Sequence, residues 1–488
     1  MRMKTDTRAH EVGFVVSAKR YLLTVEGLPS ARVNDILVDA NGNKAIVRAL
    51  HPTHVSALAL SGVAQPGDQY QFVKGAYHYC VGDYLFGRVI DALGQPVDGK
   101  GSLPPGTVPL RLEVDAPGVE VRVPIHEQLH TGVTLVDTLV PIAKGQRQLI
   151  FGPQHSGKST FLSETVRAQA KAGTVCIYTV IGKPINGLKK ITDYILSDDL
   201  SGAKTIVISA LSDEPAGRII LAPSIAFLLA EYYQAQGEHV LVILDDLDSH
   251  AKYLREIALL EERLPSTQSY PGDIFYQHAH LMERSGHFTK ALGGGSITAL
   301  PVIQTEFKNF SDLIPTNVMA CTDGHLAFLP GLRAEGIYPS ISLEQSVTRV
   351  GRQSQHTLQK QITTKTQILL GMYRQQKEYA QFSSDLSEQT KEVLRQGSVL
   401  EALLQQDTSE HIPLDVQVPL LALGFTDFFV GHSEAQVLIQ RPRIVEALLS
   451  HAGLQSLRET ALNDDVMLDD YLHEVEAVHD LIATVCQF

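Results

Sequence analysis

Cysteine is scarce in this chain of 488 residues, and its four cysteines are widely spaced. Cys80, Cys176, Cys321 and Cys486 form no C-x-x-C pair. Disulfide frameworks and cysteine zinc sites need cysteines at short, regular intervals, so both are excluded as the basis of this fold. We therefore expect the protein to work in a reducing compartment.

Long apolar runs are also absent. The most apolar stretch, Ile219 to Ala230, contains Pro223 and is shorter than the roughly 20 residues that a membrane-spanning helix needs. The first residues, Met1 to Asp6, are polar and lack the apolar core of a signal peptide. We expect any membrane role to come through partner chains.

Positive charge is in deficit, with 41 lysines and arginines against 54 aspartates and glutamates. The resulting formal net charge of −13 argues against a nucleic-acid surface as the main partner. Hydrophobic residues at 44% and charged residues at 19% are otherwise typical of a globular chain.

One motif organises the chain. Residues 152–160 read G-P-Q-H-S-G-K-S-T and match the pattern G-x-x-x-x-G-K-[ST] at every fixed position. The apolar residues 148–151 before it predict a buried strand, and residues 161–172 after it predict a helix. A strand, a loop and a helix in this order are the context that a phosphate-binding loop requires.

The chemistry of such a loop follows from its backbone. Successive N–H groups wrap a phosphate chain, and the helix N-terminus adds the positive end of its dipole. Lys158 is expected to reach the β- and γ-phosphates, and the Ser159 hydroxyl to hold Mg²⁺. The sequence thus predicts ATP or ADP with Mg²⁺. The predicted nucleotide-binding residues of the loop are Gly152, Pro153, Gln154, His155, Ser156, Gly157, Lys158, Ser159 and Thr160.

Three regions differ in pattern, and we take them as three domains. Residues 1–75 hold short β-branched strands with a hairpin signal at Asn41-Gly42, which predicts a small β-barrel. Residues 76–355 alternate buried strands with helices, which predicts an α/β nucleotide-binding domain with a mostly parallel sheet. Residues 356–488 carry apolar residues at a spacing of three to four, which predicts a helical domain.

Individual elements can be placed within this plan. The strands predicted after the phosphate loop cover residues 174–181, 205–210, 240–244 and 297–302. The helices predicted beyond the loop cover residues 223–236, 386–404 and 443–457.

Asp245 directly follows the most hydrophobic predicted strand. Ligands of parallel sheets bind at the carboxyl ends of strands, so Asp245 is expected beside the phosphate loop as the Walker B carboxylate that holds Mg²⁺ through water. The alternative is that Asp245 caps the N-terminus of the next helix.

Several further stretches resemble rotary ATPases. The central domain of that family is recognised in Leu85–Gly101, Pro271–Tyr276 and Gly293–Val302. The alpha subunits of F-type ATP synthases are indicated by Ile314–Val318, Thr322–Gly324 and Ser346–Gly351. The resemblance extends from about residue 10 to about residue 410 and is weaker in the C-terminal helices.

This resemblance implies an assembly. Three alpha and three beta-type chains alternate in a ring around a gamma-type central stalk, with a peripheral stalk, at the cytoplasmic face of a prokaryotic membrane. Alpha subunits bind nucleotide at non-catalytic sites, and an adenine pocket is implied at Tyr338, Pro339 and Gln406. The family also lends an arginine to the neighbouring catalytic site, and Arg349 matches that position. A surface salt bridge is the alternative role for Arg349.

Lys183 separates the catalytic from the non-catalytic interpretation. Catalytic relatives end the strand after the phosphate-loop helix with Gly-Glu, whereas this chain has Gly182-Lys183. A lysine cannot activate the attacking water as a carboxylate does, so we expect no turnover at this chain's own site. Asp246 is the alternative base. Lys183 also brings a cation near the expected metal.

Other departures from the family are visible. Pro153 to Ser156 stand where alpha subunits usually have Asp-Arg-Gln-Thr, and Tyr338 stands where they have Arg. About ten residues precede the first predicted strand, whereas typical alpha subunits carry an extra N-terminal helix that binds a delta subunit. This shortness resembles the alternate F-type ATPases, which often move sodium.

Three competing functions remain at the level of sequence. A catalytic homohexameric export ATPase would combine Arg349 and the phosphate loop in one ring, but Lys183 argues against it. A hexameric RNA helicase is disfavoured by the acidic balance. A scaffold with a vestigial loop can be excluded only by measuring nucleotide binding.

Overall fold

The computed structural model describes residues 11–72, 77–109, 112, 114–197, 202–263, 267–305, 312–380, 387–407 and 410–486. Residues 1–10 and Leu386, the expected first residue of a helix, lie outside these ranges. The chain divides into two compact units, which we describe one at a time. Unit 1 comprises Met1–Pro124, Gly145–Phe151 and Gln169–Thr322, and unit 2 comprises Ile125–Lys144, Gly152–Ala168 and Asp323–Phe488.

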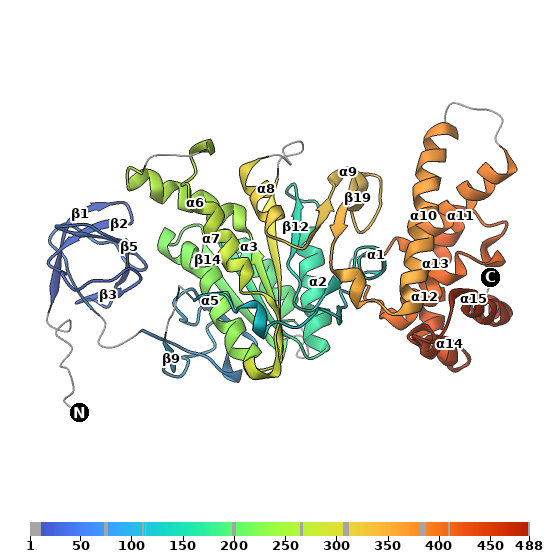
Figure 1. Cartoon of the computed structure of the whole chain (residues 1–488), viewed down its shortest axis with the longest axis horizontal. Coiled ribbons are helices and arrows are strands. Elements are labelled where there is room, and N and C mark those ends of the chain that lie inside the picture. Colours follow the sequence, from blue (N-terminus) through green and yellow to red (C-terminus); the bar gives the residue numbers. More distant parts are fainter. Residues whose placement is uncertain are drawn as a thin grey trace. The chain divides into compact units, whose positions relative to one another are not determined.

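The predicted N-terminal barrel of unit 1 is confirmed (Figure 1). Its strands are β1 (Val12–Lys19), β2 (Leu22–Glu26), β3 (Ile36–Asp39), β4 (Lys44–Leu50), β5 (Val55–Ala59) and β6 (Gln69–Phe72), closed in the order β1-β2-β5-β4-β3-β6. The Asn41-Gly42 hairpin joins β3 to β4 as an antiparallel pair, and Gly42 has φ +84°. Alternating apolar residues fill the barrel, among them the fully buried Leu23 and Val25.

A mostly parallel sheet forms the centre of unit 1, as predicted. The strands are β8 (Arg88–Asp91), β12 (Gln148–Gly152), β13 (Val175–Lys183), β14 (Thr205–Leu211), β15 (His239–Asp245) and β17 (Ser296–Gln304), in the order β12-β17-β15-β13-β14-β8. Short β16 (Gly286–His287) pairs antiparallel with β17, and β7 (His78–Tyr79) pairs with β9 (Val108–Pro109). Every residue of β14 is buried, as expected for a strand covered on both faces.

The helices of unit 1 are α3 (Ile185–Ile195), α5 (Ala216–Gln234), α6 (Leu247–Leu260), α7 (Ile274–Glu283) and α8 (Leu313–Ala320). The predicted start of α5 at Pro223 is wrong, because the helix begins seven residues earlier and Pro223 lies inside it. Residues 216–222 are mostly buried, and α5 packs against β13, β14 and β15. Burial of this apolar surface outweighs the hydrogen bond that the proline removes.

Unit 2 contains two short regular segments before its helical part. Strands β10 (Gln128–Leu129) and β11 (Ile142–Ala143) flank α1 (Thr134–Leu139). Strands β18 (Gly324–Phe328) and β19 (Ile341–Thr348) form an antiparallel pair on either side of α9 (Pro330–Ala334). Helix α2 (Lys158–Lys171) begins inside the phosphate-loop motif, three residues before the predicted start.

The C-terminal part of unit 2 is helical, as predicted (Figure 1). Its helices are α10 (Thr357–Ala380), α11 (Glu388–Leu404), α12 (Leu414–Leu423), α13 (Glu434–Ser450), α14 (Gln455–Ala461), α15 (Leu468–Ala477) and α16 (His479–Cys486). The single helix predicted over 443–457 is wrong. Helix α13 ends at Ser450, and His451 is its C-cap. The Nδ1 atom of His451 accepts a hydrogen bond from the Gly453 N–H at 3.1 Å. This local side-chain hydrogen bond competes with continuation of the helix.

Candidate nucleotide site

The loop between β12 and α2 has the torsions that its glycines allow. Gly152 has φ +149° and Gly157 has φ +99°. A Cβ atom at Gly152 would lie 2.4 Å from the carbonyl oxygen of Phe328, so a side chain at this position would clash with backbone. His155 also adopts a positive φ of 61°, which is uncommon without glycine. The loop therefore combines glycine torsions with one unfavourable torsion at His155, as functional phosphate loops can.

Lys158 crosses this loop from the first turn of α2. Its side chain is buried, and Nζ donates hydrogen bonds to the carbonyl oxygens of Gly152 at 2.7 Å and Pro153 at 2.6 Å. The ammonium charge is thus brought to the centre of the loop by the chain's own backbone. A cation in this place is available to phosphate oxygens.

The hydroxyl residues of the loop fall into two groups. Ser156 is buried, its Oγ donates to the Pro153 carbonyl at 2.8 Å, and its carbonyl accepts a hydrogen bond from Ser340 Oγ. Ser159 and Thr160 are exposed at the start of α2, where hydroxyl groups can contact a ligand. Ser156 therefore shapes the loop, while Ser159 and Thr160, like Gln154, keep their side chains exposed.

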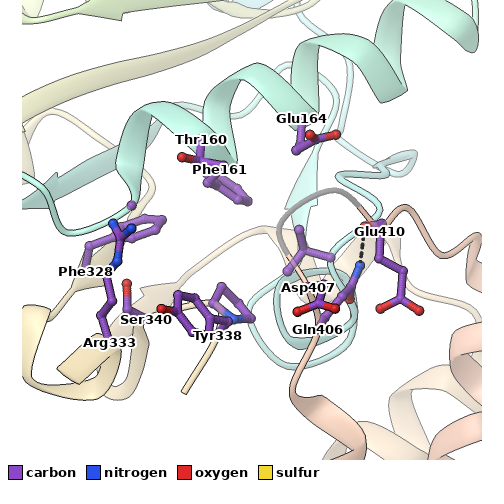
Figure 2. Close-up of a pocket in the computed structure, with 13 residues that line it drawn as sticks. Thr160, Phe161, Glu164, Phe328, Arg333, Tyr338, Ser340, Gln406, Asp407 and Glu410 are labelled. Carbon is purple, nitrogen blue, oxygen red and sulfur yellow. Dashed lines mark hydrogen bonds between the residues drawn. The ribbon is translucent and has the colours of Figure 1, made fainter. Parts of the chain in front are cut away.

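A cavity of about 120 Å³ lies against this end of α2 in unit 2 (Figure 2). Figure 2 shows Phe161 and Glu164 pointing from α2 towards the segments that carry Tyr338 and Gln406. Aromatic and apolar side chains make much of its wall, which suits a flat ring. The lining residues are Val133, Gly157, Thr160, Phe161, Glu164, Phe328, Arg333, Tyr338, Pro339, Ser340, Gln406, Asp407 and Glu410.

Tyr338, Pro339 and Gln406, the expected adenine-pocket residues, all line this cavity. The half-buried Tyr338 ring has the Arg333 guanidinium carbon 6.0 Å from its centroid. The Tyr338 carbonyl accepts a hydrogen bond from the Gln406 N–H at 2.8 Å. The two chain segments that carry these residues are therefore joined directly at the cavity.

Gln406 acts as a brace within this wall. Its Oε1 accepts hydrogen bonds from the Thr134 N–H at 2.8 Å and the Thr134 Oγ1 at 3.0 Å. Its Nε2 donates to the carbonyls of Gly132 at 2.6 Å and Glu410 at 2.8 Å, the latter drawn as a dashed line in Figure 2. The amide makes two hydrogen bonds through each of its polar atoms, so Gln406 positions the wall of the cavity.

Sequence reasoning missed several residues of this cavity. Glu164 could have been found, because it lies one helical turn after Thr160 and so shares its face of α2. Arg333 gave no such signal. Its Nη1 donates to the His155 carbonyl at 3.0 Å, a contact between segments far apart in sequence.

Asp245 belongs to unit 1 and is described with its own neighbours. It is the last residue of β15, is almost fully buried, and one of its oxygens accepts a hydrogen bond and forms an ion pair. Tyr178 Oη lies 2.7 Å and Lys183 Nζ lies 2.5 Å from Asp245 Oδ2. Burial and the Asp245 carboxylate hold the pKa of Tyr178 well above its usual value, so the tyrosine remains a donor.

The neighbouring Asp246 is the residue that caps a helix. Its side chain accepts from the Ser249 N–H at 2.7 Å, at the N-terminus of α6, and from Gln304 Nε2 at 2.8 Å. The alternative that Asp245 caps this helix is therefore wrong by one residue. Burial raises the pKa of Asp246 to about 6, and the adjacent Asp245 charge adds to this rise.

These neighbours do not fit the magnesium ion that the phosphate-loop motif and the strand pattern predict at Asp245. Mg²⁺ binds oxygen acceptors in octahedral geometry, whereas Lys183 and Tyr178 present donors to the carboxylate oxygen. Among the described residues, no group of three or more His, Cys, Asp or Glu side chains could hold a metal ion.

Arg349 follows β19 in unit 2, with an exposed side chain. Its N–H donates to the Asp323 carbonyl at 3.0 Å, which fixes the backbone at this point. Burial lowers the pKa of His325, and the charge of Arg349 lowers it further. Within the described part of the chain, the Arg349 guanidinium makes no ion pair, so the surface salt bridge weighed as its alternative role is not seen there.

Comparisons with known proteins show which family the chain resembles. Residues 132–348 match the model of the ATP synthase alpha/beta family, nucleotide-binding domain, and residues 355–476 match that of the ATP synthase alpha/beta chain, C terminal domain.

In the described ranges, no helix is both long and apolar enough for a membrane crossing.

Curated relatives cover nearly the whole chain. ATP synthase subunit alpha of Acholeplasma laidlawii is 36% identical over 98% of this chain and 95% of its own length. ATP synthase subunit alpha 1 of Rhodopirellula baltica is 35% identical over 91% of this chain and 88% of its own length. ATP synthase subunit alpha of Dictyoglomus turgidum is 33% identical over 96% of this chain and 92% of its own length. The chain therefore belongs to the ATP synthase alpha/beta family, among the alpha subunits of the F-type ATP synthases.

Proposed function

We propose that this chain is a non-catalytic nucleotide-binding subunit that lends Arg349 to the catalytic site of a neighbouring beta-type chain. It binds ATP or ADP through the loop Gly152–Thr160 and the cavity at Tyr338. It works in a ring with three beta-type chains, around a gamma-type stalk and beside a peripheral stalk. It reaches the membrane only through the ion-translocating sector, at the cytoplasmic face, and it binds no nucleic acid.

Lys183 is the observation that carries the non-catalytic role. Hydrolysis needs a group that orients or deprotonates the attacking water, and an ammonium ion cannot accept that proton. The Lys183 ammonium is in addition paired with the buried Asp245. Asp246, the alternative base, is held by Ser249 and Gln304, both of which donate to its oxygens.

The exposed guanidinium of Arg349 supports a role towards a neighbouring chain. A guanidinium presents several donors in a fixed plane and can stabilise charge on a transferring phosphoryl group from across an interface. The side chain is exposed at the end of β19, where it is accessible to a second chain.

The test is ATP turnover by the purified chain, alone and mixed with beta-type and gamma-type partner chains. We expect no steady turnover from the chain alone and steady turnover from the mixture. Arg349→Ala should reduce turnover of the mixture roughly a thousandfold, the lower end of what an arginine supplied in trans contributes. Arg443→Ala, an exposed arginine on α13, is the matched control and should leave turnover unchanged.

Two outcomes would contradict this function. Steady turnover by the chain alone, abolished by Arg349→Ala, would indicate the alternative, a catalytic homohexameric export-type ATPase. Turnover of the mixture that Arg349→Ala leaves intact would remove the role of Arg349 while keeping the ring.

A further inference from the structure

Lys183 and Asp245 form a buried ion pair in unit 1 in which the carboxylate has little room for another cation. The Nζ–Oδ2 distance is 2.5 Å, and the two side chains are 16% and 2% exposed. Tyr178 Oη donates to the same oxygen at 2.7 Å. A charged donor and a neutral donor thus converge on Asp245 Oδ2, which satisfies this oxygen of the buried carboxylate without a metal.

The backbone of β13 is shaped to make this contact. Tyr178 and Lys183 are five residues apart, so an unbroken strand would point them to opposite faces of the sheet. The register against β14 shifts between Ile181, opposite Ala210, and Lys183, opposite Leu211. This shift adds one residue, as a β-bulge does, and so re-aims the side chain of Lys183 towards the face of Tyr178.

Gly182 permits the bulge. It has φ +66°, and a Cβ atom in its place would lie 2.8 Å from Ser249 Cβ. The glycine and the lysine therefore act together, one by bending the strand and the other by reaching Asp245. The ion pair therefore depends on the backbone conformation at the end of β13, and not only on the rotamers of the two side chains.

The chemistry of the pair conflicts with a divalent ion at the same carboxylate. Mg²⁺ keeps most of its water shell and needs oxygen acceptors around it, even when a carboxylate binds it through water. The Lys183 ammonium is a strongly hydrated donor with no lone pair, so it cannot serve as a ligand. A dication beside it would face like charge in a buried environment, where repulsion is poorly screened.

From these contacts we infer that Lys183 takes the place of the magnesium ion at Asp245, so that this chain binds ATP or ADP without a divalent cation. The inference rests on the proposed function, because it assumes that the loop Gly152–Thr160 binds nucleotide. It adds a specific property: the affinity for nucleotide does not depend on Mg²⁺.

The test is isothermal titration calorimetry of the full-length chain with ADP and with ATP, in excess Mg²⁺ and in EDTA. Calorimetry suits a chain with no tryptophan to report on binding. For the wild-type chain, we expect the two Kd values for each nucleotide to agree within about twofold, which is a small difference on the free-energy scale.

Lys183→Gln is the informative variant, because it removes the cation and keeps a polar side chain of similar reach. We expect Mg²⁺ to tighten nucleotide binding by this variant about tenfold or more, the scale on which groups around a metal affect its affinity. Lys190→Gln, an exposed lysine on the following helix α3, is the control and should behave as the wild type.

The outcomes separate the inference from the function on which it rests. Wild-type binding that Mg²⁺ tightens tenfold or more would overturn the inference and leave nucleotide binding in place. No binding of either nucleotide, with or without Mg²⁺, would overturn both. The wild-type comparison needs no variant, so it decides the matter even where Lys183→Gln does not fold.

Discussion

At the scale of single residues, two adjacent aspartates at the end of β15 have separate tasks. Asp245 is the partner of Lys183 and Tyr178, whereas Asp246 caps α6 and accepts from Gln304. Both carboxylates are about 1% exposed, so each depends on its donors. The division of roles follows from position, because Asp245 is the last residue of β15 and Asp246 is the N-cap of α6.

The first residue-scale prediction concerns stability. Lys183→Met leaves the buried Asp245 carboxylate without its cation, and we expect the free energy of unfolding to fall by about 3 kcal/mol. Adding Asp245→Asn removes the unpaired charge and should recover part of this loss. Denaturant unfolding of both variants, followed by circular dichroism, measures the difference.

Lys190→Met is the control for that experiment, because Lys190 is exposed and near Lys183 in sequence. A loss below about 0.5 kcal/mol for Lys183→Met would place the pair among surface ion pairs, which contribute little. A double variant that is less stable than the single variant would also contradict the buried-pair description.

At the scale of elements, local signals and burial compete. Prolines illustrate this in α5, α12 and α13, each of which contains an internal proline. Of these helices, α12 is buried at every residue except Asp415, and its packing compensates for the missing hydrogen bond. Local propensity alone predicts breaks at these positions, which explains the wrong start of α5.

Helix α13 offers an element-scale prediction. Ser433 caps its N-terminus in a capping box, with Ser433 Oγ accepting from the Gln436 N–H and Gln436 Oε1 accepting from the Ser433 N–H. Ser433→Ala should therefore lower the free energy of unfolding by about 1 kcal/mol. Thermal unfolding by circular dichroism checks this value.

Ser450→Ala is the matched comparison for the cap. Ser450 is exposed at the other end of α13, and its hydroxyl only donates back to the Glu446 carbonyl. It should change stability by less than about 0.5 kcal/mol. Equal effects of the two substitutions would argue that the capping box contributes nothing specific. Because the chain forms two compact units, unfolding can show more than one transition, and the midpoint of each transition is compared separately.

At the scale of the whole molecule, acid sensitivity is expected from a buried histidine pair. His250 and His278 lie on α6 and α7, with His250 Nδ1 3.2 Å from His278 Nε2. Burial, with a smaller contribution from the charge of Arg48 and against the hydrogen bond to the Ile220 carbonyl, lowers the pKa of His250 to about 4. Burial lowers the pKa of His278 to about 3, with His250 adding to the shift.

Below about pH 6.5, both histidines therefore stay neutral in the folded chain until the pH approaches 4. In the unfolded chain, where histidine has a pKa of about 6.5, the same residues already take up protons in this range. The unfolded state binds more protons across this window, so the free energy of unfolding falls as pH falls from about 6.5 towards 4. For His250 alone, the loss between pH 6.5 and pH 5 is roughly 2 kcal/mol. Unfolding measured across this range checks the slope.

His278→Gln keeps a donor for His250 but removes one titrating group, so its stability should depend less steeply on pH. His473→Gln, an exposed histidine on α15, should leave the slope unchanged. A wild-type stability that is flat between pH 6.5 and pH 5 would contradict the buried, neutral state of the pair.

The sequence by itself determined the barrel, the succession of buried strands along the chain, the helical C-terminal part and the phosphate loop. These depend on local patterns: alternation in the barrel, apolar runs in the sheet, and a glycine-lysine motif whose spacing has a direct physical meaning. The assignment of Tyr338 and Gln406 to a nucleotide cavity came from family resemblance, and both line a cavity in unit 2.

Only the tertiary structure decided what those residues contact. The pairing of Lys183 with Asp245 depends on a one-residue bulge at Gly182, and the brace role of Gln406 depends on Gly132 and Thr134, more than 270 residues earlier. Arg333 reaches the phosphate loop at His155 in the same way. Sequence patterns show the spacing of apolar residues within one segment. A contact between distant segments depends on strand register and packing, which no local pattern encodes.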